Sequence, residues 1–498
     1  MSLLGLDLGT SACKAATFDI GGKLFATATR EYSGYAPRPG WLEMDPEIMW
    51  RAAAGAIREA AAKTDDPVQA LAVSSQGETF IPVDAQGQAI GPAIMNADNR
   101  AVEEVREFER NIGKQEVYSI TGCVLHPMYG LLKILWLKKN APDVYDRASR
   151  FFSAGDYALA RMEVEPYTDY SLASRLMAFD VTKREWSDSI LSLAGVSADR
   201  LPEVRPSGTR AGVLSATVAG GLGLLEGTVV AVGGHDQPCG ALGAGVIDAG
   251  DTADSAGTYE CLAVVSDTPN LGADALSFSL NSYCHVVPDR YVTLAFFPAG
   301  IVLRWFRDEF GQSEVEEAKR TGMDAYDLLT SRAPDGPSGI LFTPHFIGSG
   351  NPTWNARATG AVVGLTPDRS KYHLLKAILE GIACEIRTNV AVFEETVGPV
   401  DLLRTTGGGA KSAYWLQLRA DITGRKVAAM GSPEAVCLGA AILAGVGAGA
   451  YPDARYGART AAAVATVYEP NAGRTAEYAD QIRRYQRLYP VLADCEVY

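Results

Sequence analysis

Apolar residues occur in short runs that end at glycine-rich turns, and their spacing changes along the chain. The first segment predicts a β-meander, with strands over residues 3–8, 14–19 and 23–30. The pair Asp45-Pro46 then predicts a helix that ends near residue 63, because Asp is a good N-cap and Pro suits the first helical position. Strands and helices are mixed from there on, which indicates the α/β class.

The second half of the chain predicts helices around a run of glycines. An apolar stripe at helical spacing marks a long helix over 371–395. A strand over 401–406 leads into Gly407-Gly408-Gly409, and the next helix, over 412–423, ends at Gly424, where a C′ glycine is favoured. The apolar run 436–450 is shorter than the about 20 residues that span a bilayer, so we expect a buried helix there.

The opening pattern is repeated near residue 251. A strand over 251–255, a turn at Ala256-Gly257-Thr258 and a strand over 259–266 parallel the first two strands and the turn between them. The repeat predicts two halves, which we place at residues 1–247 and 248–498, although no Ser- or Pro-rich linker marks the boundary.

The composition is that of a soluble globular protein. The 498 residues are 47% hydrophobic and 21% charged, which excludes a disordered or fibrous chain. A net charge of −14 argues against partners such as nucleic acid or an anionic membrane, since both need a basic face. A small anionic ligand needs only a local site and is not excluded.

Cysteine and histidine usage bears on the compartment. The Cys residues are scattered singly without a C-x-x-C pair, and the His residues show no metal-ligand spacing, so we expect neither a disulfide scaffold nor a structural zinc site. The N-terminus has no basic segment, and Asp7 interrupts its apolar run. We therefore predict no signal peptide and a cytoplasmic location. A homodimer is among the assemblies that the sequence leaves open.

The first hairpin turn (Gly9-Thr10-Ser11) is a candidate phosphate site. Such a turn can aim backbone N–H groups at phosphate oxygens, and Asp7 before it could hold Mg²⁺ directly or through water. The alternative is a plain hairpin with a solvated Asp, which the local sequence favours. The second hairpin turn (Gly257-Thr258) makes the plain hairpin less favoured, because two such turns facing each other would clamp a triphosphate.

The glycine turn (Gly407-Gly408-Gly409) lies between a strand and a helix. Glycines let a flat ring or a phosphate approach the backbone closely, and a helix N-terminus adds favourable partial charge. The run matches neither the P-loop nor the dinucleotide-binding pattern. A strand–helix turn without a ligand is the equally weighted alternative.

Asp236 is the candidate general base. It follows an apolar strand over 228–232 in what reads as a glycine-flanked loop, a suitable place for a catalytic acid. A solvated loop Asp is the alternative that the local sequence favours, and we expect His235 to be structural. The polar clusters at 74–79 and 96–100 could bind a polyol or could serve as loop and cap residues.

In order, these motifs resemble the FGGY family of carbohydrate kinases over nearly the whole chain. The resemblance implies the fold of the actin-like ATPases, with two ribonuclease-H-like domains and ATP in the cleft between them. The blocks that carry it are Gly5–Ser11 with Lys14, Gly40–Pro46 with Trp50, Lys133–Leu137, Asp169–Ser174 with Asp180 and Trp186–Asp188, Gly360–Leu365 through Glu380-Gly381, and Gly407–Ser412 with Trp415 and Ala420–Gly424. Gly130 departs from the first family signature, which prefers Pro, Ser or Thr there.

The resemblance implies roles for individual residues. Asp236 matches the Asp that accepts the proton of the sugar hydroxyl, and Asp7 matches the acid linked to Mg²⁺. The implied ATP-binding residues are Gly9, Thr10, Ser11, Lys14, Gly257, Thr258, Gly408, Gly409 and Lys411. The implied substrate-binding residues are Gln76, Gly77, Glu78, Asp98, Asp236 and Gln237.

These residues imply ATP and a small neutral sugar or polyol as partners, and we expect a pentulose such as D-xylulose. Glu78 and Asp98 would accept hydrogen bonds from hydroxyls and repel a carboxylate, for which Arg100 and Arg175 are the nearby candidates. Gln76-Gly77-Glu78-Thr79 differs from the Met-His-Gly block of xylulokinases and resembles glycerol kinases with Gly in place of Arg, which would leave room for a longer chain. Gluconate, glycerol or tetritols, and hexuloses are the alternative acceptors. An actin-like regulatory ATPase is the alternative from another class.

Overall fold

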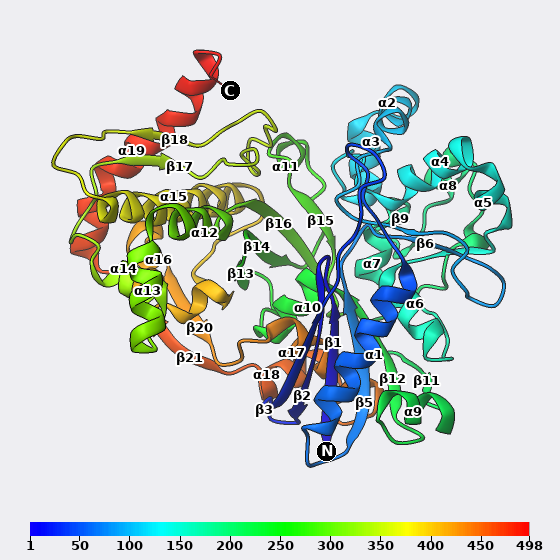
Figure 1. Cartoon of the computed structure of the whole chain (residues 1–498). Coiled ribbons are helices and arrows are strands. Elements are labelled where there is room, and N and C mark those ends of the chain that lie inside the picture. Colours follow the sequence, from blue (N-terminus) through cyan, green and yellow to red (C-terminus); the bar gives the residue numbers. More distant parts are fainter. Residues whose placement is uncertain (498) are drawn as a thin grey trace.

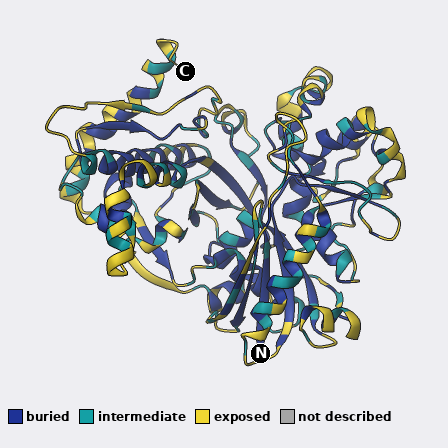
Figure 2. Cartoon of the chain, viewed as in Figure 1, coloured by how far each residue is buried: buried dark blue, intermediate teal, exposed yellow. Residues whose placement is uncertain are grey.

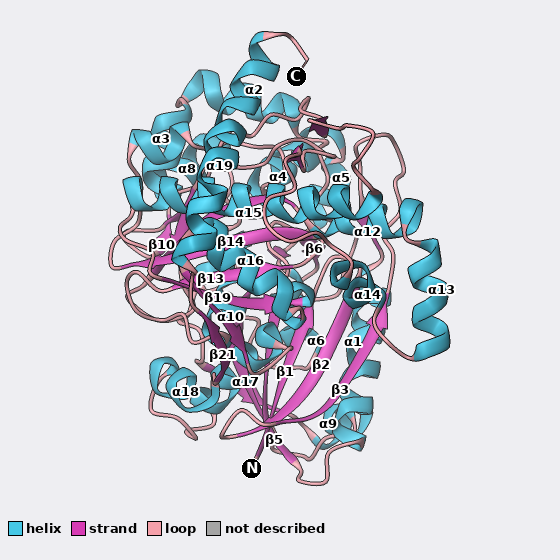
Figure 3. Ribbon diagram, turned by 90° about the vertical axis from the view of Figure 1, so that its left-hand side faces the viewer, coloured by secondary structure: helices cyan, strands magenta, loops and turns pink. Residues whose placement is uncertain are grey.

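The computed structural model describes residues 1–497, and it has two lobes, each built around a mixed β-sheet (Figure 1). The first sheet has the strand order β11 (Arg210–Val213), β12 (Val229–His235), β5 (Val68–Ser75), β1 (Ser2–Leu8), β2 (Ala12–Asp19) and β3 (Leu24–Glu31). The second has the order β15 (Asn281–Cys284), β16 (Tyr291–Pro298), β14 (Tyr259–Ser266), β13 (Thr252–Ala256), β19 (Leu402–Gly407), β20 (Lys426–Met430) and β21 (Val464–Tyr468). In the view of Figure 3, β13, β14 and β19 lie above β1, β2 and β3.

Helices and short strand pairs surround both sheets. The strand pairs are β4 (Glu43–Met44) with β7 (Ala93–Ile94), β6 (Ile81–Val83) with β8 (Arg150–Phe152), β9 (Phe179–Asp180) with β10 (Glu185–Trp186), and β17 (Leu341–Thr343) with β18 (Ala361–Val363). The helices up to residue 243 are α1 (Pro46–Ala62), α2 (Val102–Asn111), α3 (Lys114–Thr121), α4 (Gly130–Asn140), α5 (Pro142–Arg147), α6 (Ala154–Arg161), α7 (Tyr170–Ser174), α8 (Asp188–Ala194), η1 (Ala198–Arg200), α9 (Ala216–Leu222) and α10 (Asp236–Gly243). The later helices are α11 (Ala273–Ser277), α12 (Gly300–Phe310), α13 (Gln312–Thr321), α14 (Ala325–Ser331), α15 (Lys371–Thr396), η2 (Gly408–Lys411), α16 (Ala413–Thr423), α17 (Ala435–Gly447), α18 (Ala454–Ala461) and α19 (Ala472–Asp494).

The two sheets repeat one arrangement of strands. In the first, β1 pairs with β2 in antiparallel and with β5 in parallel register. In the second, β13 pairs with β14 in antiparallel and with β19 in parallel register. The repeat expected from the sequence is therefore present in the fold, and the α/β class is confirmed.

Local sequence signals explain where α1 and α16 begin and end. Asp45 Oδ1 accepts the backbone N–H of Glu47 at 2.9 Å, and Pro46 follows at the first helical position, as predicted. Gly424 ends α16 with a φ of 67°, a left-handed conformation that favours glycine. Both helices place their apolar positions in the interior, where Figure 2 shows buried strands enclosed by helices with exposed outer faces.

Helix α17 crosses from the second half of the chain to the first sheet. It is the buried helix expected over 436–450, and it packs against β1, β5 and α10 (Figure 1). Glycines allow the close approach: a Cβ atom on Gly439 would lie 1.9 Å from the Cys239 carbonyl oxygen, and one on Gly5 would lie 1.8 Å from that of Cys437. The division at residue 247 stays a prediction, and α17 ties the two halves together across it.

The predicted loop after residue 232 is wrong. Strand β12 continues through Gly233, Gly234 and His235, and Asp236 is the first residue of α10. The glycines belong to the strand because β12 lies tightly against β5: a Cβ atom on Gly233 would lie 1.9 Å from the Val73 carbonyl oxygen. Asp236 is therefore held by a strand and a helix rather than by a solvated loop.

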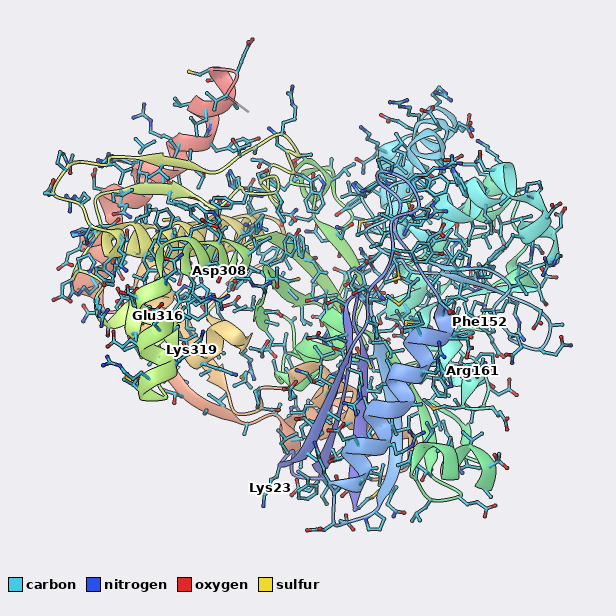
Figure 4. The ribbon with its side chains drawn as sticks, in the orientation of Figure 1. Lys23, Phe152, Arg161, Asp308, Glu316 and Lys319 are labelled. Atoms are coloured by element: carbon cyan, nitrogen blue, oxygen red, sulfur yellow. The ribbon has the colours of Figure 1, made fainter. Side chains whose placement is uncertain are left out.

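Many charged side chains lie at the surface of the molecule. Figure 4 shows the labelled Lys23, Glu316 and Lys319 at the periphery of the molecule, and all three are exposed. Among residues 1–497, no helix has the length and hydrophobicity needed to cross a membrane.

Candidate active site

The parallel strands β1, β5 and β12 end together at one edge of the first sheet. Asp7 lies opposite Ser74, and Ser74 lies opposite Gly234. The residues that follow these positions therefore gather at this edge, which is where ligands bind in open α/β sheets. The edge carries Asp7, the loop at 76–79 and Asp236.

Asp7 and Asp236 each have a buried carboxylate oxygen, Oδ1, that accepts no aligned hydrogen bond within residues 1–497. Burial, partly offset by Lys14, raises the pKa of Asp7 to about 7. Burial and the charges of Asp7 and Glu78 raise the pKa of Asp236 to about 8. Perturbed carboxylates with orphaned oxygens indicate a place for a cation or a reacting hydroxyl.

The donor set fits magnesium. Hard carboxylate oxygens suit Mg²⁺, which one or two carboxylates and the substrate's phosphates commonly hold without a closed protein cage. The described part of the chain, residues 1–497, contains no cluster of three or more His, Cys, Asp or Glu arranged for a metal. Asp7 is therefore suited to share a metal with a nucleotide.

The first hairpin turn is supported from below by Gln76. Thr10 and Ser11 are exposed, whereas Gln76 is buried. The Gln76 side chain donates to the Gly9 carbonyl oxygen at 3.3 Å and accepts from the Thr10 hydroxyl at 3.1 Å. Gln76 thus fixes the turn, and its contacts are those of a support for the turn more than of a sugar ligand.

Lys14 connects this hairpin to the second half of the chain. Its ammonium lies 2.6 Å from Glu434 Oε2, just before α17. Both side chains are partly exposed, so the pair lies at the surface of the site and not in the core.

The second hairpin turn and the glycine turn lie side by side. Ala256 is paired with Gly407 in the parallel register of β13 and β19, so the chain segments after them begin at the same edge of the second sheet. Gly257, Thr258, Gly408 and Lys411 are exposed there. The structure thus brings together the residues predicted to bind the nucleotide in this half.

Helix α12 begins against the second hairpin turn. The Ile301 N–H donates to the Thr258 carbonyl oxygen at 3.0 Å, and Arg304 donates to the Thr258 hydroxyl at 3.4 Å. The sequence reasoning missed Arg304. Its signal would have been a cation one helical turn after Gly300, but that signal is visible only once α12 is known to dock here.

A buried ion network lies under these turns. Arg419 Nη1 donates to Asp254 Oδ2 at 2.6 Å and to Glu260 Oε1 at 2.5 Å, and all three side chains are fully buried. The guanidinium also lies over the Trp415 ring at 4.1 Å. Asp254 is on β13, Glu260 is on β14 and Arg419 is on α16, so the network binds the second hairpin to the helix that follows the glycine turn.

The 76–79 loop is held by two buried basic side chains, Arg175, which the sequence offered only as a partner for a substrate carboxylate, and Lys133, for which it gave no role. Arg175 Nε donates to Glu78 Oε1 at 2.5 Å. Lys133 Nζ donates to the carbonyl oxygens of Glu78 at 3.2 Å and Met95 at 2.6 Å. Glu78 itself has a φ of 57°, unusual for a residue with a side chain, so these contacts hold a strained backbone in place.

The expectation that Gly77 leaves room for a longer substrate is wrong. A Cβ atom on Gly77 would lie 2.9 Å from His235 Nε2 and 3.0 Å from Arg175 Cγ. The space that a larger residue would need is taken by the protein's own side chains, which come from β12 and from the end of α7. No local pattern could have revealed them.

Asp98 makes its contacts within the protein. It is completely buried; Oδ1 accepts from Arg100 Nε at 2.9 Å, and Oδ2 accepts from the Leu42 N–H at 2.6 Å. Gln237, by contrast, follows Asp236 on α10 and is partly exposed. The substrate role of Asp98 stays a prediction, and its observed contacts brace Arg100 against the neighbouring chain segment.

Two sheets of like topology, each with an exposed hairpin turn, together with carboxylates at the end of the first, define a two-domain α/β phosphotransferase. Comparison with protein families narrows this class. Residues 2–243 match the N-terminal domain of the FGGY family of carbohydrate kinases, and residues 253–448 match its C-terminal domain. The chain therefore belongs to the FGGY family of carbohydrate kinases.

Individual relatives agree with this membership. A gluconokinase of Bacillus subtilis is 31% identical over 89% of this chain and 86% of its own length. An autoinducer-2 kinase of Klebsiella pneumoniae is 32% identical over 98% of this chain and 93% of its own. The crystal structure of a ligand-bound xylulose kinase from Lactobacillus acidophilus superposes with a TM-score of 0.88 at 25% identity, covering 99% of this chain and 98% of that one.

The family fixes the kind of enzyme. Its members have the actin-like ATPase fold, use ATP, generally with a divalent metal, and transfer a phosphoryl group to a sugar hydroxyl. The fold class, the enzyme class and the family resemblance expected from the sequence are therefore confirmed. The acceptor sugar is not fixed by family membership.

Proposed function

We propose that this carbohydrate kinase transfers the γ-phosphoryl group of ATP to a hydroxyl of a small neutral ketose, most specifically a pentulose such as D-xylulose, with Asp236 as general base. The observation that carries the proposal is the pair of carboxylates Asp7 and Asp236, which lie at one sheet edge and both have a raised pKa. One acid serves the nucleotide side of the transfer and the other serves the acceptor.

The nucleotide is proposed to bridge the two halves. Thr10 and Ser11 of the first hairpin turn and Gly257 and Thr258 of the second offer exposed N–H and hydroxyl groups for phosphate oxygens. The glycine turn, with Gly408, Gly409 and Lys411, is proposed to take the adenosine side. Asp7 would hold Mg²⁺, which when bound neutralises charge on the phosphates.

Asp236 is proposed to remove the acceptor's proton. Phosphoryl transfer needs an oriented hydroxyl and a base within hydrogen-bond reach of it. A carboxylate held between β12 and α10 has little freedom, so it can keep one oxygen directed at the hydroxyl. Its raised pKa, about 8, brings it near the working range of a base at neutral pH.

The arginines near the site support a neutral acceptor. Arg100 is paired with both Asp98 and Glu43, and Arg175 is paired with Glu78. Each positive charge already has a carboxylate partner, so neither offers a free cation for the carboxylate of gluconate. One nitrogen of Arg175, Nη1, is buried and makes no hydrogen bond within residues 1–497, which suits a hydroxyl or carbonyl oxygen.

Other acceptors follow from the relatives. Gluconate and the substrate of the autoinducer-2 kinases are alternatives because the corresponding relatives are 31% and 32% identical to this chain. Glycerol, tetritols and hexuloses complete the set, and a regulatory ATPase without a sugar substrate is the alternative from another class. A cytoplasmic location, a homodimer and the division into residues 1–247 and 248–498 stay predictions.

The test is kcat/KM across an acceptor panel at saturating MgATP. The panel holds D-xylulose and other pentuloses, hexuloses, gluconate, glycerol, tetritols and autoinducer-2. We expect a pentulose to give the highest value, and analogues lacking one hydroxyl to fall steeply because polar groups would be left unpaired. A higher value for gluconate or glycerol than for every ketose would overturn the specificity. ATP turnover that no acceptor stimulates would overturn the kinase assignment itself.

A further inference from the structure

His235 lies between the 76–79 loop and Asp236. It is the last residue of β12, its ring is buried, and its backbone N–H donates to Ser171 Oγ at 2.8 Å. A side chain on Gly77 would collide with its Nε2. The ring therefore has one fixed place, directly beside the proposed base.

The two ring nitrogens of His235 face different partners. Nδ1 lies 2.8 Å from the Tyr283 hydroxyl, and Nε2 lies 3.2 Å from Asp236 Oδ1. This Oδ1 accepts no aligned hydrogen bond within residues 1–497, and His235 Nε2 is close enough to become its donor. Such contacts are often poorly aligned in a free enzyme and tighten when substrate binds.

The surroundings keep both the His235 ring and the Tyr283 hydroxyl uncharged. Burial lowers the pKa of His235 well below its usual value, so the ring is neutral and carries a single N–H. Burial raises the pKa of Tyr283 well above its usual value, so its hydroxyl keeps its proton. A protonated Tyr283 hydroxyl can donate to Nδ1, and in that arrangement the ring N–H is at Nε2 and faces Asp236.

We propose that His235, held in this tautomer by Tyr283, positions the Asp236 carboxylate, its Nε2–H binding Oδ1 and leaving Oδ2 for the acceptor hydroxyl. The inference rests on the proposed function, in which Asp236 is the general base. His235 is a positioning residue: it donates a hydrogen bond and transfers no proton. Tyr283 lies on β15 of the second sheet, so a hydroxyl from one half orients the base of the other.

Three variants separate this role from simple packing. His235→Leu removes the donor, His235→Gln keeps an N–H close to the Nε2 position, and Tyr283→Phe removes the hydroxyl but keeps the ring beneath Arg175. With the best acceptor of the panel, we expect His235→Leu to lower kcat about 10- to 100-fold, since misplacing a catalytic group by about 1 Å costs on that order. KM for ATP should stay within about 3-fold. His235→Gln should recover most of kcat.

Tyr283 should act only through His235. Tyr283→Phe should lower kcat by less than His235→Leu, and the double variant should be no slower than His235→Leu alone, because interacting residues are not additive. In ¹H–¹⁵N spectra of the histidine rings, the wild type should show the Nε2–H tautomer for His235, and Tyr283→Phe should show a mixture. The matched control is Tyr118→Phe, which also removes a buried hydroxyl that bonds across the halves, to Asn270 at 3.0 Å. It should leave both readouts unchanged.

The outcomes are distinguishable. Wild-type kcat in folded His235→Leu, or His235→Gln as slow as His235→Leu, would overturn the inference while Asp236→Asn remained inactive. An Nδ1–H tautomer in the wild type would overturn it even where His235→Leu failed to fold. Near wild-type kcat in Asp236→Asn would overturn the proposed base, and the positioning role with it.

Discussion

The hairpins that begin the two halves share one strand arrangement and differ in the chemistry beneath their turns. Asp7, one residue before the end of β1, has a buried carboxylate oxygen that accepts no aligned hydrogen bond within residues 1–497. The equivalent position on β13 is Ser255, and the carboxylates of that hairpin, Asp254 and Glu260, are bound to Arg419. The fold thus supplies two similar turns, and the side chains place an acid without a cation partner under the first and two carboxylates paired with Arg419 under the second.

This difference indicates a division of work between the halves. The first hairpin and the end of β12 hold unsatisfied, partly protonated carboxylates, which destabilise a folded protein and are kept where chemistry needs them. In the second half Arg419 holds the buried carboxylates Asp254 and Glu260, and the exposed Gly257 and Thr258 lie at the surface. Changes to the first should therefore alter catalysis, and changes under the second should alter stability.

The largest expected effect is the loss of activity in Asp236→Asn. Losing a general base costs about 10²- to 10⁴-fold in rate, and kcat with the best acceptor measures it. ATP binding, followed by calorimetry, should be preserved because Asp236 serves the acceptor. Ser255→Ala, at the second-half position equivalent to Asp7, is the control in the second half and should alter kcat by less than about 2-fold. Similar losses in both variants would erase the proposed division.

The next effect is on stability, in Arg419→Met. Removing one partner of a buried ion network leaves uncompensated charge and typically costs about 3–5 kcal/mol of the free energy of unfolding. Burial already raises the pKa of Glu260, and Arg419 opposes this shift, so losing the cation should raise the folded pKa further and make stability fall more steeply as pH rises. Denaturant unfolding should therefore show a larger loss at about pH 8 than at about pH 5.

A surface ion pair gives the control for this prediction. Arg425 pairs with Glu394 on the surface of the same half, so Arg425→Met should cost less than about 1 kcal/mol, with little dependence on pH. Equal losses for Arg419→Met and Arg425→Met would show that the buried network adds nothing to the support of the second hairpin.

The sequence predicted what local signals encode. The cap at Asp45, the C′ position of Gly424 and the two hairpins depend on neighbours in sequence, and the structure confirms them. The ordered motifs predicted the family for the same reason, since each motif is a local feature.

What the sequence could not predict depends on contacts between distant segments. In the sequence, Gly77 suggests free space for a substrate, but in the fold β12 and the end of α7 place His235 and Arg175 against it. Lys133 lies inside a recognised motif, but its bonds to the Glu78 and Met95 carbonyls appear only in the folded chain. The sequence did not show the helical position of Asp236, because Gly233 and Gly234 are typical of a loop. In the fold, close packing against β5 requires Gly233, and the Val286 side chain leaves no room for a side chain at Gly234.

A third prediction concerns the stability cost of the proposed base. The folded pKa of Asp236 is raised to about 8, so folding favours its protonated form and stability falls as pH rises from the unfolded value towards 8. Asp236→Asn has no ionisable group at this position, so it should be more stable than the wild type at about pH 8. The expected gain in the free energy of unfolding is up to about 1.4 kcal/mol for each unit by which the folded pKa of Asp236 exceeds its unfolded pKa. Unfolding without ligands, at about pH 5 and pH 8, measures it. The exposed Asp199 supplies the control Asp199→Asn, which should show no such gain. A gain of the same size there would contradict a raised pKa specific to Asp236.

The smallest effect on stability and activity is expected at Lys14, which forms an ion pair between the two halves. Lys14 is paired with Glu434 at 2.6 Å, and both side chains are partly exposed, so Lys14→Met should cost less than about 1 kcal/mol of stability. Its effect on the nucleotide should be larger, because the variant loses a cation beside the first hairpin turn and leaves the Glu434 carboxylate to repel phosphate. We expect KM for ATP to rise about 3- to 10-fold, with kcat little changed.

Glu434→Gln releases Lys14 from its partner and should leave KM for ATP unchanged or lower it, so the two variants act in opposite directions. Equal increases in KM would mean that the ion pair, rather than the lysine charge, is what the nucleotide site needs. The first half would then support ATP by holding its hairpin rigid, as the Arg419 network does in the second.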